Sequence, residues 1–231
     1  MSEPELIITH AEALKRRMSS LPPADPAVIE SGRMAAEQAN RERHLARIHE
    51  HWNAPKRHLL TTPHPQYADW NRAFSGIVGK LGSGFTVALV GTRGNGKTQL
   101  GVELMKHAAE KRLQSSRFLT AVEFFMATKA TYGRQDLSES DVLGLYCKPA
   151  LLVIDEIGRR ADTPWENNLL FELLNRRYND LKDTVLIANL TPAAFAASVG
   201  PSIVRRMNES GGVVECYWPE IATTLNLDRK R

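Results

Sequence analysis

The sequence has few cysteines and no long hydrophobic run. Only two of its 231 residues are cysteines, Cys147 and Cys216, and they stand far apart without the spacing of a metal site. This excludes a disulfide-rich fold and a cysteine-based zinc domain, and we expect both thiols in or near the core. No apolar run approaches the length of a membrane helix, and the stretch MSEPELIITH lacks the basic-then-apolar design of a signal peptide. We therefore expect a cytoplasmic protein without a membrane partner.

The composition is that of a globular protein. Hydrophobic residues make up 42% of the chain and charged residues 24%, which is close to the average of soluble proteins. A chain of this length can form one or two hydrophobic cores. The net charge of +4 only weakly indicates an acidic partner such as nucleic acid, because many proteins without such a partner are equally basic.

A glycine-rich loop follows an apolar run in the stretch VALVGTRGNGKTQL, residues 87–100. It matches G-x-x-x-x-G-K-[ST], the pattern of a phosphate-binding loop. Glycines let backbone N–H groups approach an anion closely, the lysine supplies charge for the β- and γ-phosphates, and the threonine hydroxyl can bind Mg²⁺. The alternative is a chance glycine-rich turn before a helix. We predict nucleotide contacts from Gly91, Thr92, Arg93, Gly94, Asn95, Gly96, Lys97, Thr98 and Gln99.

A second apolar run ends in two acidic residues. The stretch ALLVIDEIG has the continuous apolar character of a buried parallel strand, and it leads into Asp155 and Glu156. In phosphate-loop enzymes an aspartate in this position helps to hold Mg²⁺. We predict Thr98 and Asp155 as metal ligands and Glu156 as the base that activates a water molecule. The alternative is a strand followed by two solvated acids in a turn.

The central and C-terminal parts alternate strand and helix signals, which predicts a parallel α/β sheet. A complete strand–helix unit separates the loop strand from the Asp155 strand, so these two strands should not be neighbours in the sheet. Expected strands cover 85–90, 116–121, 150–154, 184–190 and 212–218, and expected helices cover 97–114, 121–133, 138–147, 163–180, 191–198 and 201–210.

The N-terminal part has helical patterns and no strand signal. A first helix would carry Leu6, Ile7, His10, Leu14 and Met18 near one face. A second should begin with Asp25 as cap and Pro26 in its first turn; its thin apolar stripe joins Met34, Gln38, Arg41, Leu45, Ile48 and Trp52. Such a stripe suits docking on a partner or on the main domain, and a solvated helix folded against its own chain is an equal alternative. The stretch NAPKRHLLTTPHPQYADW, residues 53–70, indicates an extended connector.

Two further polar features could complete a hydrolytic site. Asn189 follows the apolar stretch TVLIA, so it should lie beside Asp155 and could position water or contact the γ-phosphate. A plain turn former is the alternative. Arg205 and Arg206 stand in SIVRRMNES, and an arginine from one subunit can complete a neighbour's site. A solvated surface pair is the alternative for these two residues.

Several motifs together resemble the DnaC/IstB-like family of AAA+ ATPases, which includes bacterial and phage replicative helicase loaders and transposition helpers. They are GTRGNGKT, LLVIDEIG, NRRYND, ANLT and VRRMNESGGVVECYWPE, and the resemblance covers about residues 55–220. It implies an AAA+ core, which is a parallel sheet sandwiched by helices. We expect no C-terminal lid, because too few residues follow Met207 to form one. It also implies a helical domain at 1–54 that binds a helicase, a linker and start of the ATPase domain at 55–80, and the ATPase domain at 81–231.

The resemblance also implies roles for individual residues. Lys97 and Thr98 would bind phosphate and Mg²⁺, and Asn189 would be the first sensor. Arg206 aligns with the family's trans-acting arginine finger. The pair Arg176 and Arg177 would act at a subunit contact or near the nucleotide.

The function that the resemblance implies is that of a helicase loader. It would bind ATP and Mg²⁺, assemble side by side into a homo-oligomer, and deliver a hexameric DnaB-type helicase to single-stranded DNA, with Lys129 and Arg134 as candidate phosphate contacts on DNA. The alternative is an IstB-like ATPase that regulates a transposase on duplex DNA. A module that uses nucleotide only as a switch is a third reading, against which Glu156 argues, since a pure binder needs no water-activating group.

Overall fold

The computed structural model describes residues 15, 25–63, 67–218 and 223–225. Apart from Lys15, the first expected N-terminal helix lies outside these residues. The chain divides between His44 and Leu45 into two compact units. Within the described ranges, no helix is long and apolar enough to cross a membrane.

Helix α2, Pro26–Glu50, begins where the sequence predicted. Asp25 Oδ1 accepts a hydrogen bond from the backbone N–H of Ala27 at 2.9 Å, and proline at the first helical position is compatible with the free N–H groups of a helix start. The described residues up to His44 are exposed. In the second unit the end of α2 buries Ile48, and the chain continues into the buried side chain of Trp52.

Five parallel strands form the main sheet of the second unit, in the order β3-β4-β5-β2-β6. The predicted α/β fold is confirmed, and β5 separates β2 from β4 as the strand–helix order required. Val87 of β2 and Val153 of β4 both pair with Val185 of β5. The strands are β2 Thr86–Val90, β3 Ser116–Thr120, β4 Leu151–Asp155, β5 Asp183–Ala188 and β6 Gly212–Glu215.

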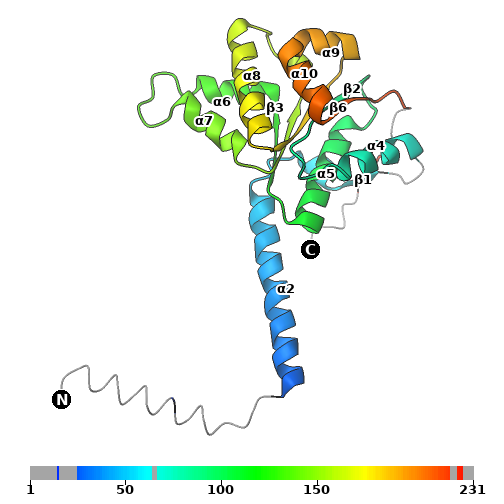
Figure 1. Ribbon diagram of the computed structural model, residues 1–231, viewed down its shortest axis with the longest axis vertical. Helices are drawn as coiled ribbons and strands as arrows, with labels where there is room; N and C mark the ends of the chain where they lie inside the picture. The colour runs from blue at the N-terminus through cyan, green and yellow to red at the C-terminus, as the bar shows by residue number, and fades with distance from the viewer. Residues whose placement is uncertain (1–14, 16–24, 64–66, 219–222, 226–231) are drawn as a thin grey trace, which may run out of the picture. The chain divides into compact units, whose positions relative to one another are not determined.

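Helices cover both faces of this sheet (Figure 1). On one face, strand residues such as Leu89 and Val153 pack against helices α4 and α5. On the other face, strand residues such as Ile154 and Leu186 pack against helices α6 to α10. Alternate residues of each strand therefore serve opposite cores. The helices on the first face are α4 Ala68–Val78 and α5 Lys97–Arg112; those on the other are α6 Ala121–Lys129, α7 Glu139–Cys147, α8 Pro164–Asn179, α9 Pro192–Val199 and α10 Pro201–Ser210.

The expectation of an extended connector at 53–70 is wrong. Residues Lys56–Leu59 form a short helix, α3, and α4 begins at Ala68. Strand β1, Thr61–Pro63, pairs antiparallel with β7, Thr223–Leu225. The sequence-based expectation rested on the prolines of this segment, whereas burial of Trp52 and Trp70 in the core holds it in a defined path.

Arg177 on α8 is fully buried, so its predicted role at a subunit contact or near the nucleotide is wrong. Its guanidinium donates to the carbonyls of Tyr146 and Pro149 at 2.9 and 3.0 Å and to the hydroxyl of Thr184 at 2.9 Å. Burial lowers its pKa to about 10, yet the group stays charged at neutral pH. Arg177 therefore ties the α7–β4 connection to the start of β5, at the amino ends of the strands.

Replacing Arg177 by methionine should destabilise the protein strongly, because several buried oxygens would lose their donor. We expect the free energy of unfolding in urea to fall by about 3 kcal/mol. Arg176→Met is the matched control, since Arg176 is partly exposed and pairs with Glu172 on the helix surface; its cost should stay near about 0.5 kcal/mol. Equal unfolding midpoints for the two variants would contradict this assignment.

Candidate functional site

The carboxyl ends of β2, β4 and β5 meet at one edge of the sheet, and the candidate site lies there. This is where ligands bind in open α/β sheets. A loop joins β2 to α5, Asp155 ends β4, and Asn189 follows β5 directly. A cavity of about 300 Å³ is lined by Arg57, His58, Arg93, Gly94, Asn95, Gly96, Lys97, Thr98, Gln99 and Asn189.

The loop requires glycine at two particular positions. Gly91 has φ of 139°, and a Cβ atom on it would lie 2.6 Å from the carbonyl oxygen of Cys216. Gly96 has φ of 70° in the left-handed region and precedes the first residue of α5. A side chain at either position would be strained, so the curled loop depends on both glycines.

Lys97 is buried inside this loop. Its ammonium donates to the carbonyl of Gly91 at 3.0 Å and to that of Thr92. Burial lowers the pKa of Lys97, while the charges of Cys216 and Asp155 raise it. Because burial raises the pKa of Cys216 to about 12, that thiol is neutral at pH 7. The Asp155 carboxylate is therefore the negative charge that stabilises the Lys97 ammonium.

Thr98 and Asp155 meet across the site. The Thr98 hydroxyl donates to Asp155 Oδ2 at 2.7 Å, and the backbone N–H of Glu156 donates to Oδ1 at 2.6 Å. Burial raises the pKa of Asp155, and these two hydrogen bonds oppose the shift. A hydroxyl and a carboxylate side by side are hard oxygen ligands of the kind that Mg²⁺ prefers. The described residues contain no group of three or more His, Cys, Asp or Glu side chains that could hold a metal, so an ion bound by Thr98 and Asp155 would also need oxygen from water or phosphate.

Glu156 has a left-handed backbone, with φ of 58°. Such a conformation is uncommon for a residue with a Cβ atom and occurs often at functional sites. Its carboxylate accepts from Arg159 Nη1 at 3.0 Å. This exposed ion pair turns the carboxylate toward the short helix that follows β4, and the water-activating role of Glu156 stays a prediction.

The structure brings Asn189 to the cavity but not Arg206. Asn189 is exposed and lines the cavity together with the loop. The Arg206 guanidinium lies over the rings of Phe171 and Tyr178, 5.1 and 5.7 Å from their centroids, and donates to Asn175 Oδ1 at 2.8 Å. Any contact of Arg206 with a nucleotide would therefore be made in a neighbouring subunit, and this role also stays a prediction.

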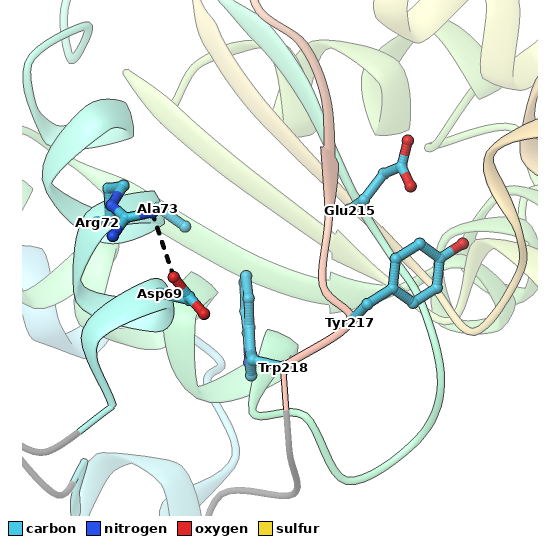
Figure 2. Close-up of a pocket in the computed structure, with 6 residues that line it drawn as sticks. All are labelled: Asp69, Arg72, Ala73, Glu215, Tyr217 and Trp218. Carbon is cyan, nitrogen blue, oxygen red and sulfur yellow. Dashed lines mark ion pairs between the residues drawn. The ribbon is translucent and has the colours of Figure 1, made fainter.

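Two tryptophans support the loop from outside, and the sequence analysis missed both. Trp70 Nε1 donates to the carbonyl of Gly96 at 3.2 Å, and Trp218 Nε1 donates to that of Asn95 at 2.6 Å. The Asn95 amide in turn donates to the Trp218 carbonyl. Trp218 also lines a second cavity of about 520 Å³ (Figure 2), whose lining residues are Asp69, Arg72, Ala73, Glu215, Tyr217 and Trp218.

Arg57 and His58 were also missed. They come from the segment that the composition indicated as a connector, more than thirty residues before the loop. No local motif marks them, because the fold of α3 alone brings them to the cavity.

Comparison with known proteins points to one family. Residues 83–204 match the model of a family described as IstB-like ATP binding protein. The protein YdaV of Escherichia coli (strain K12) is 29% identical over 137 residues, which cover 59% of this chain and 54% of that protein. The replicative helicase loader DnaC of the same strain is 26% identical over 117 residues, or 51% of this chain and 47% of DnaC.

Solved structures agree with the sequence comparison. The crystal structure of the DnaC helicase loader superposes with a TM-score of 0.59 at 25% identity, and covers 71% of this chain and 97% of that chain. AMPPCP-bound DnaA from Aquifex aeolicus has a TM-score of 0.55 at 19% identity over 66% of this chain and 47% of DnaA, and so shares the fold. The chain spans about half the length of the curated relatives that it matches.

Asp155→Asn should stabilise the protein at neutral pH. Burial raises the pKa of Asp155 in the folded state. Asp155 therefore stabilises the fold below its unfolded-state pKa of about 3.9, where it is protonated, and this stabilisation is lost as the pH rises through the folded-state pKa. The asparagine side chain removes the buried charge, and its amide oxygen can still accept from the Thr98 hydroxyl. We expect the variant to melt at a higher temperature than the wild type at pH 7 and the difference to shrink toward pH 4.

Asp136→Asn is the control, because the pKa of Asp136 is shifted in the opposite direction. Its hydrogen bond from Arg134 holds the pKa of Asp136 below its usual value, and the side chain is exposed. This variant should melt at or slightly below the wild-type temperature at pH 7. An Asp155→Asn difference that stays constant from pH 4 to pH 8 would contradict the role of burial.

Proposed function

The chain belongs to the family of IstB-like ATP-binding proteins, a DnaC/IstB-like group of AAA+ proteins, and on that premise we propose that it is an ATP-hydrolysing helicase loader. It would bind a DnaB-type replicative helicase and deliver it to single-stranded DNA. The observation that carries the nucleotide part is the hydrogen bond from Thr98 to Asp155 at 2.7 Å beside the buried ammonium of Lys97.

Each group at the loop has chemistry that suits ATP and Mg²⁺. The loop N–H groups and the positive end of α5 would face the phosphates. Lys97 would exchange the carbonyls of Gly91 and Thr92 for oxygens of the β- and γ-phosphates. Thr98 and Asp155 would hold Mg²⁺, whose bound form supplies positive charge where negative charge develops during phosphoryl transfer.

Hydrolysis would need a positioned water molecule. Glu156 stands next to Asp155 and could orient and deprotonate water once its carboxylate leaves Arg159. Asn189, on the neighbouring strand end, would contact the γ-phosphate or the water. Arg206 would complete the site of the next subunit in a side-by-side homo-oligomer.

A surface group formed by Lys129 at the end of α6, Tyr132 in the turn that follows and Trp165 on α8 supports binding of single-stranded DNA. The ring of Tyr132 meets the ring of Trp165 edge-on, with centroids 6.2 Å apart, and Lys129 Nζ lies 5.3 Å from the Trp165 centroid. Tyr132 is 59% exposed. Aromatic rings beside a cation suit base stacking and a phosphate contact. Arg134 pairs with Asp136 at 2.7 Å, which favours Lys129 over Arg134 as the phosphate contact.

Two activities of the family remain to be distinguished. The solved DnaC helicase loader, matched over 97% of its chain, favours a loader. The family description, IstB-like, keeps open an ATPase that regulates a DNA transposase on duplex DNA. The decisive difference is the partner, because only the loader requires a helicase.

Arg206→Ala should lower the rate of ATP hydrolysis by about a thousandfold or more, as removal of an arginine finger does, and leave ATP binding intact. Arg205→Ala is the matched control, since Arg205 is the exposed neighbour on the same helix. Mixing the Arg206→Ala protein with an inactive Glu156→Gln protein should restore hydrolysis, because the second protein supplies the arginine. No recovery in the mixture, with both variants folded by thermal melting, would contradict a role in trans.

The loader assignment is tested by recruitment of the cognate DnaB-type helicase to immobilised single-stranded DNA by the full chain with ATP. We expect the full chain to bind the helicase, and Tyr132→Ala to keep that binding while recruiting about tenfold less helicase to DNA. Arg134→Gln is the matched control and should recruit normally. ATP hydrolysis without helicase binding, together with binding to duplex DNA, would favour the transposase regulator instead.

A further inference from the structure

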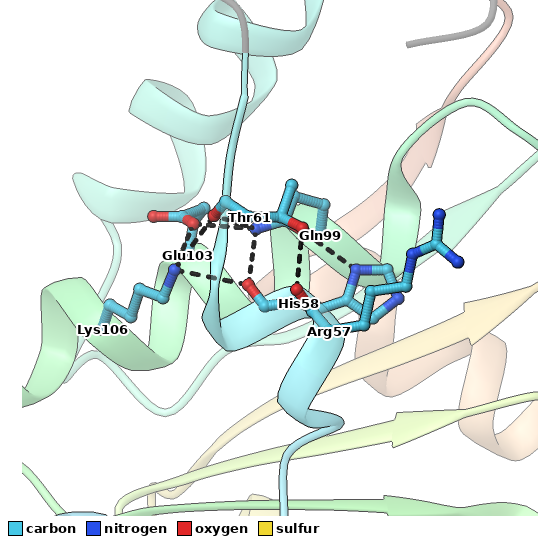
Figure 3. Close-up of polar contacts among 6 residues, drawn as sticks. All are labelled: Arg57, His58, Thr61, Gln99, Glu103 and Lys106. Atoms are coloured by element: carbon cyan, nitrogen blue, oxygen red, sulfur yellow. Dashed lines mark hydrogen bonds and ion pairs between the residues drawn. The ribbon is translucent and has the colours of Figure 1, made fainter. Parts of the chain in front are cut away.

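Gln99 connects the phosphate loop to α3. It follows Lys97 and Thr98 on α5, but its buried side chain points to the short helix before the loop strand (Figure 3). Three acceptors share the two N–H bonds of Gln99 Nε2: the carbonyls of His58 and Thr61 at 3.0 and 3.2 Å and Glu103 Oε1 at 2.8 Å. Thr98 and Gln99 directly follow the phosphate-binding lysine but have different partners. Thr98 faces the proposed metal site, whereas Gln99 contacts helix α3.

These bonds fix the orientation of the His58 ring. Because Gln99 Nε2 is the donor to backbone carbonyls, Gln99 Oε1 must be the acceptor in its 2.8 Å contact with His58 Nδ1. The hydrogen-bond network therefore assigns the proton to Nδ1. The other ring nitrogen, Nε2, has no hydrogen-bond partner among the described residues. Donation from Nε2 to a phosphate oxygen would require the imidazolium form, in which both ring nitrogens carry a proton.

Segment 52–61 is anchored on both sides of α3. On one side the backbone N–H of Phe118 on β3 donates to the Trp52 carbonyl at 2.7 Å. On the other side the Gln99 network is completed by an ion pair of Glu103 with Lys106 at 2.7 Å, both largely buried. Helix α3 is therefore held against α5 before any ligand binds, which is the pre-organisation that a binding residue needs.

The cavity that α3 borders is basic. Of the described residues that line it, Arg57, His58, Arg93 and Lys97 can carry positive charge and none is acidic. The Arg57 guanidinium lies outside the dashed network of Figure 3, and no described acidic side chain pairs with it. A cavity of this charge fits a polyanion, and α3 forms a part of its wall that the loop does not supply.

The position of His58 indicates which part of the polyanion it would face. Arg57 and His58 line the same cavity as Thr98, whose hydroxyl donates to Asp155, and as Asn189, the proposed contact of the γ-phosphate. Thr98 and Asp155 would hold Mg²⁺ at this end of the cavity, where the ion would supply positive charge beside the terminal phosphates. His58 therefore lies on the side of the terminal phosphate.

We propose that Arg57 and His58 bind the terminal phosphate of the nucleotide from α3, across the cavity from the phosphate loop, and that Gln99 is the residue that positions them. This inference rests on the proposed nucleotide site. It makes α3 a device that distinguishes a nucleoside triphosphate from a diphosphate within one subunit, because only the triphosphate carries the group that these two side chains reach.

The test is a titration of the full chain with fluorescent mant-ATP and mant-ADP in the presence of Mg²⁺. Arg57→Gln and His58→Gln should each weaken mant-ATP binding by about tenfold, the effect of losing one charge-assisted hydrogen bond, and change mant-ADP binding far less. Lys56→Gln is the matched control, because Lys56 is an exposed cation on the same helix that does not line the cavity; it should bind both nucleotides as the wild type does.

A double-variant cycle separates positioning by Gln99 from general stability. If Gln99 acts through His58, Gln99→Leu should weaken mant-ATP binding. The double variant His58→Gln/Gln99→Leu should then lose no more affinity for mant-ATP than the weaker-binding of the two single variants. Additive losses would remove Gln99 from this role. Should Gln99→Leu melt far below the wild type, the exposed Arg57→Gln variant decides the proposal.

The outcomes distinguish this inference from the function on which it rests. Wild-type affinity for mant-ATP in both Arg57→Gln and His58→Gln, with binding lost in Lys97→Ala, would overturn the role of α3 and leave the nucleotide site intact. Equal losses for mant-ATP and mant-ADP would overturn the assignment to the terminal phosphate. A wild-type chain that binds neither nucleotide would overturn both proposals.

Discussion

The hydrogen bond from Thr98 to Asp155 is the contact on which the candidate site depends. It joins the first turn of α5 to the end of β4, although β5 lies between β2 and β4 in the sheet. The 2.7 Å contact is possible only because all three strands are parallel and end at the same edge, and because Gly91 and Gly96 let the loop curl tightly from β2 into α5. Without this contact the proposed metal ligands would belong to separate elements with no fixed relation.

Two buried cations mark opposite ends of the sheet, and the difference between them separates a structural role from a functional one. At the amino ends, Arg177 is enclosed and all its main partners are fixed carbonyls and a hydroxyl of the chain itself. At the carboxyl ends, Lys97 also donates to carbonyls, those of Gly91 and Thr92, but a cavity opens beside it. Phosphate oxygens can replace carbonyls at Lys97, whereas no ligand can reach Arg177.

Local patterns were sufficient to predict the parts of the fold and site that are continuous in sequence. The loop, the strand ending at Asp155 and the strand before Asn189 are each marked by a motif or an apolar run, and the strand–helix order excluded adjacency of β2 and β4. Residues brought in from a distance could not be predicted this way. Arg57, His58, Trp70 and Trp218 carry no spacing signal relative to the loop, and the prolines of 53–70 obscured two helices. Arg176 and Arg177 are adjacent and chemically identical, and only the phase of α8 decides which is buried.

We propose the loop between β2 and α5 as the nucleotide site, with Thr98 and Asp155 as its metal ligands. Calorimetric titration of the full chain with ATP, with and without Mg²⁺, tests it most directly. We expect one ATP per chain, a gain in affinity on adding Mg²⁺ that disappears in Thr98→Val, and loss of all binding in Lys97→Ala. ATP binding of unchanged affinity in Lys97→Ala, or a Mg²⁺ effect unchanged in Thr98→Val, would contradict it.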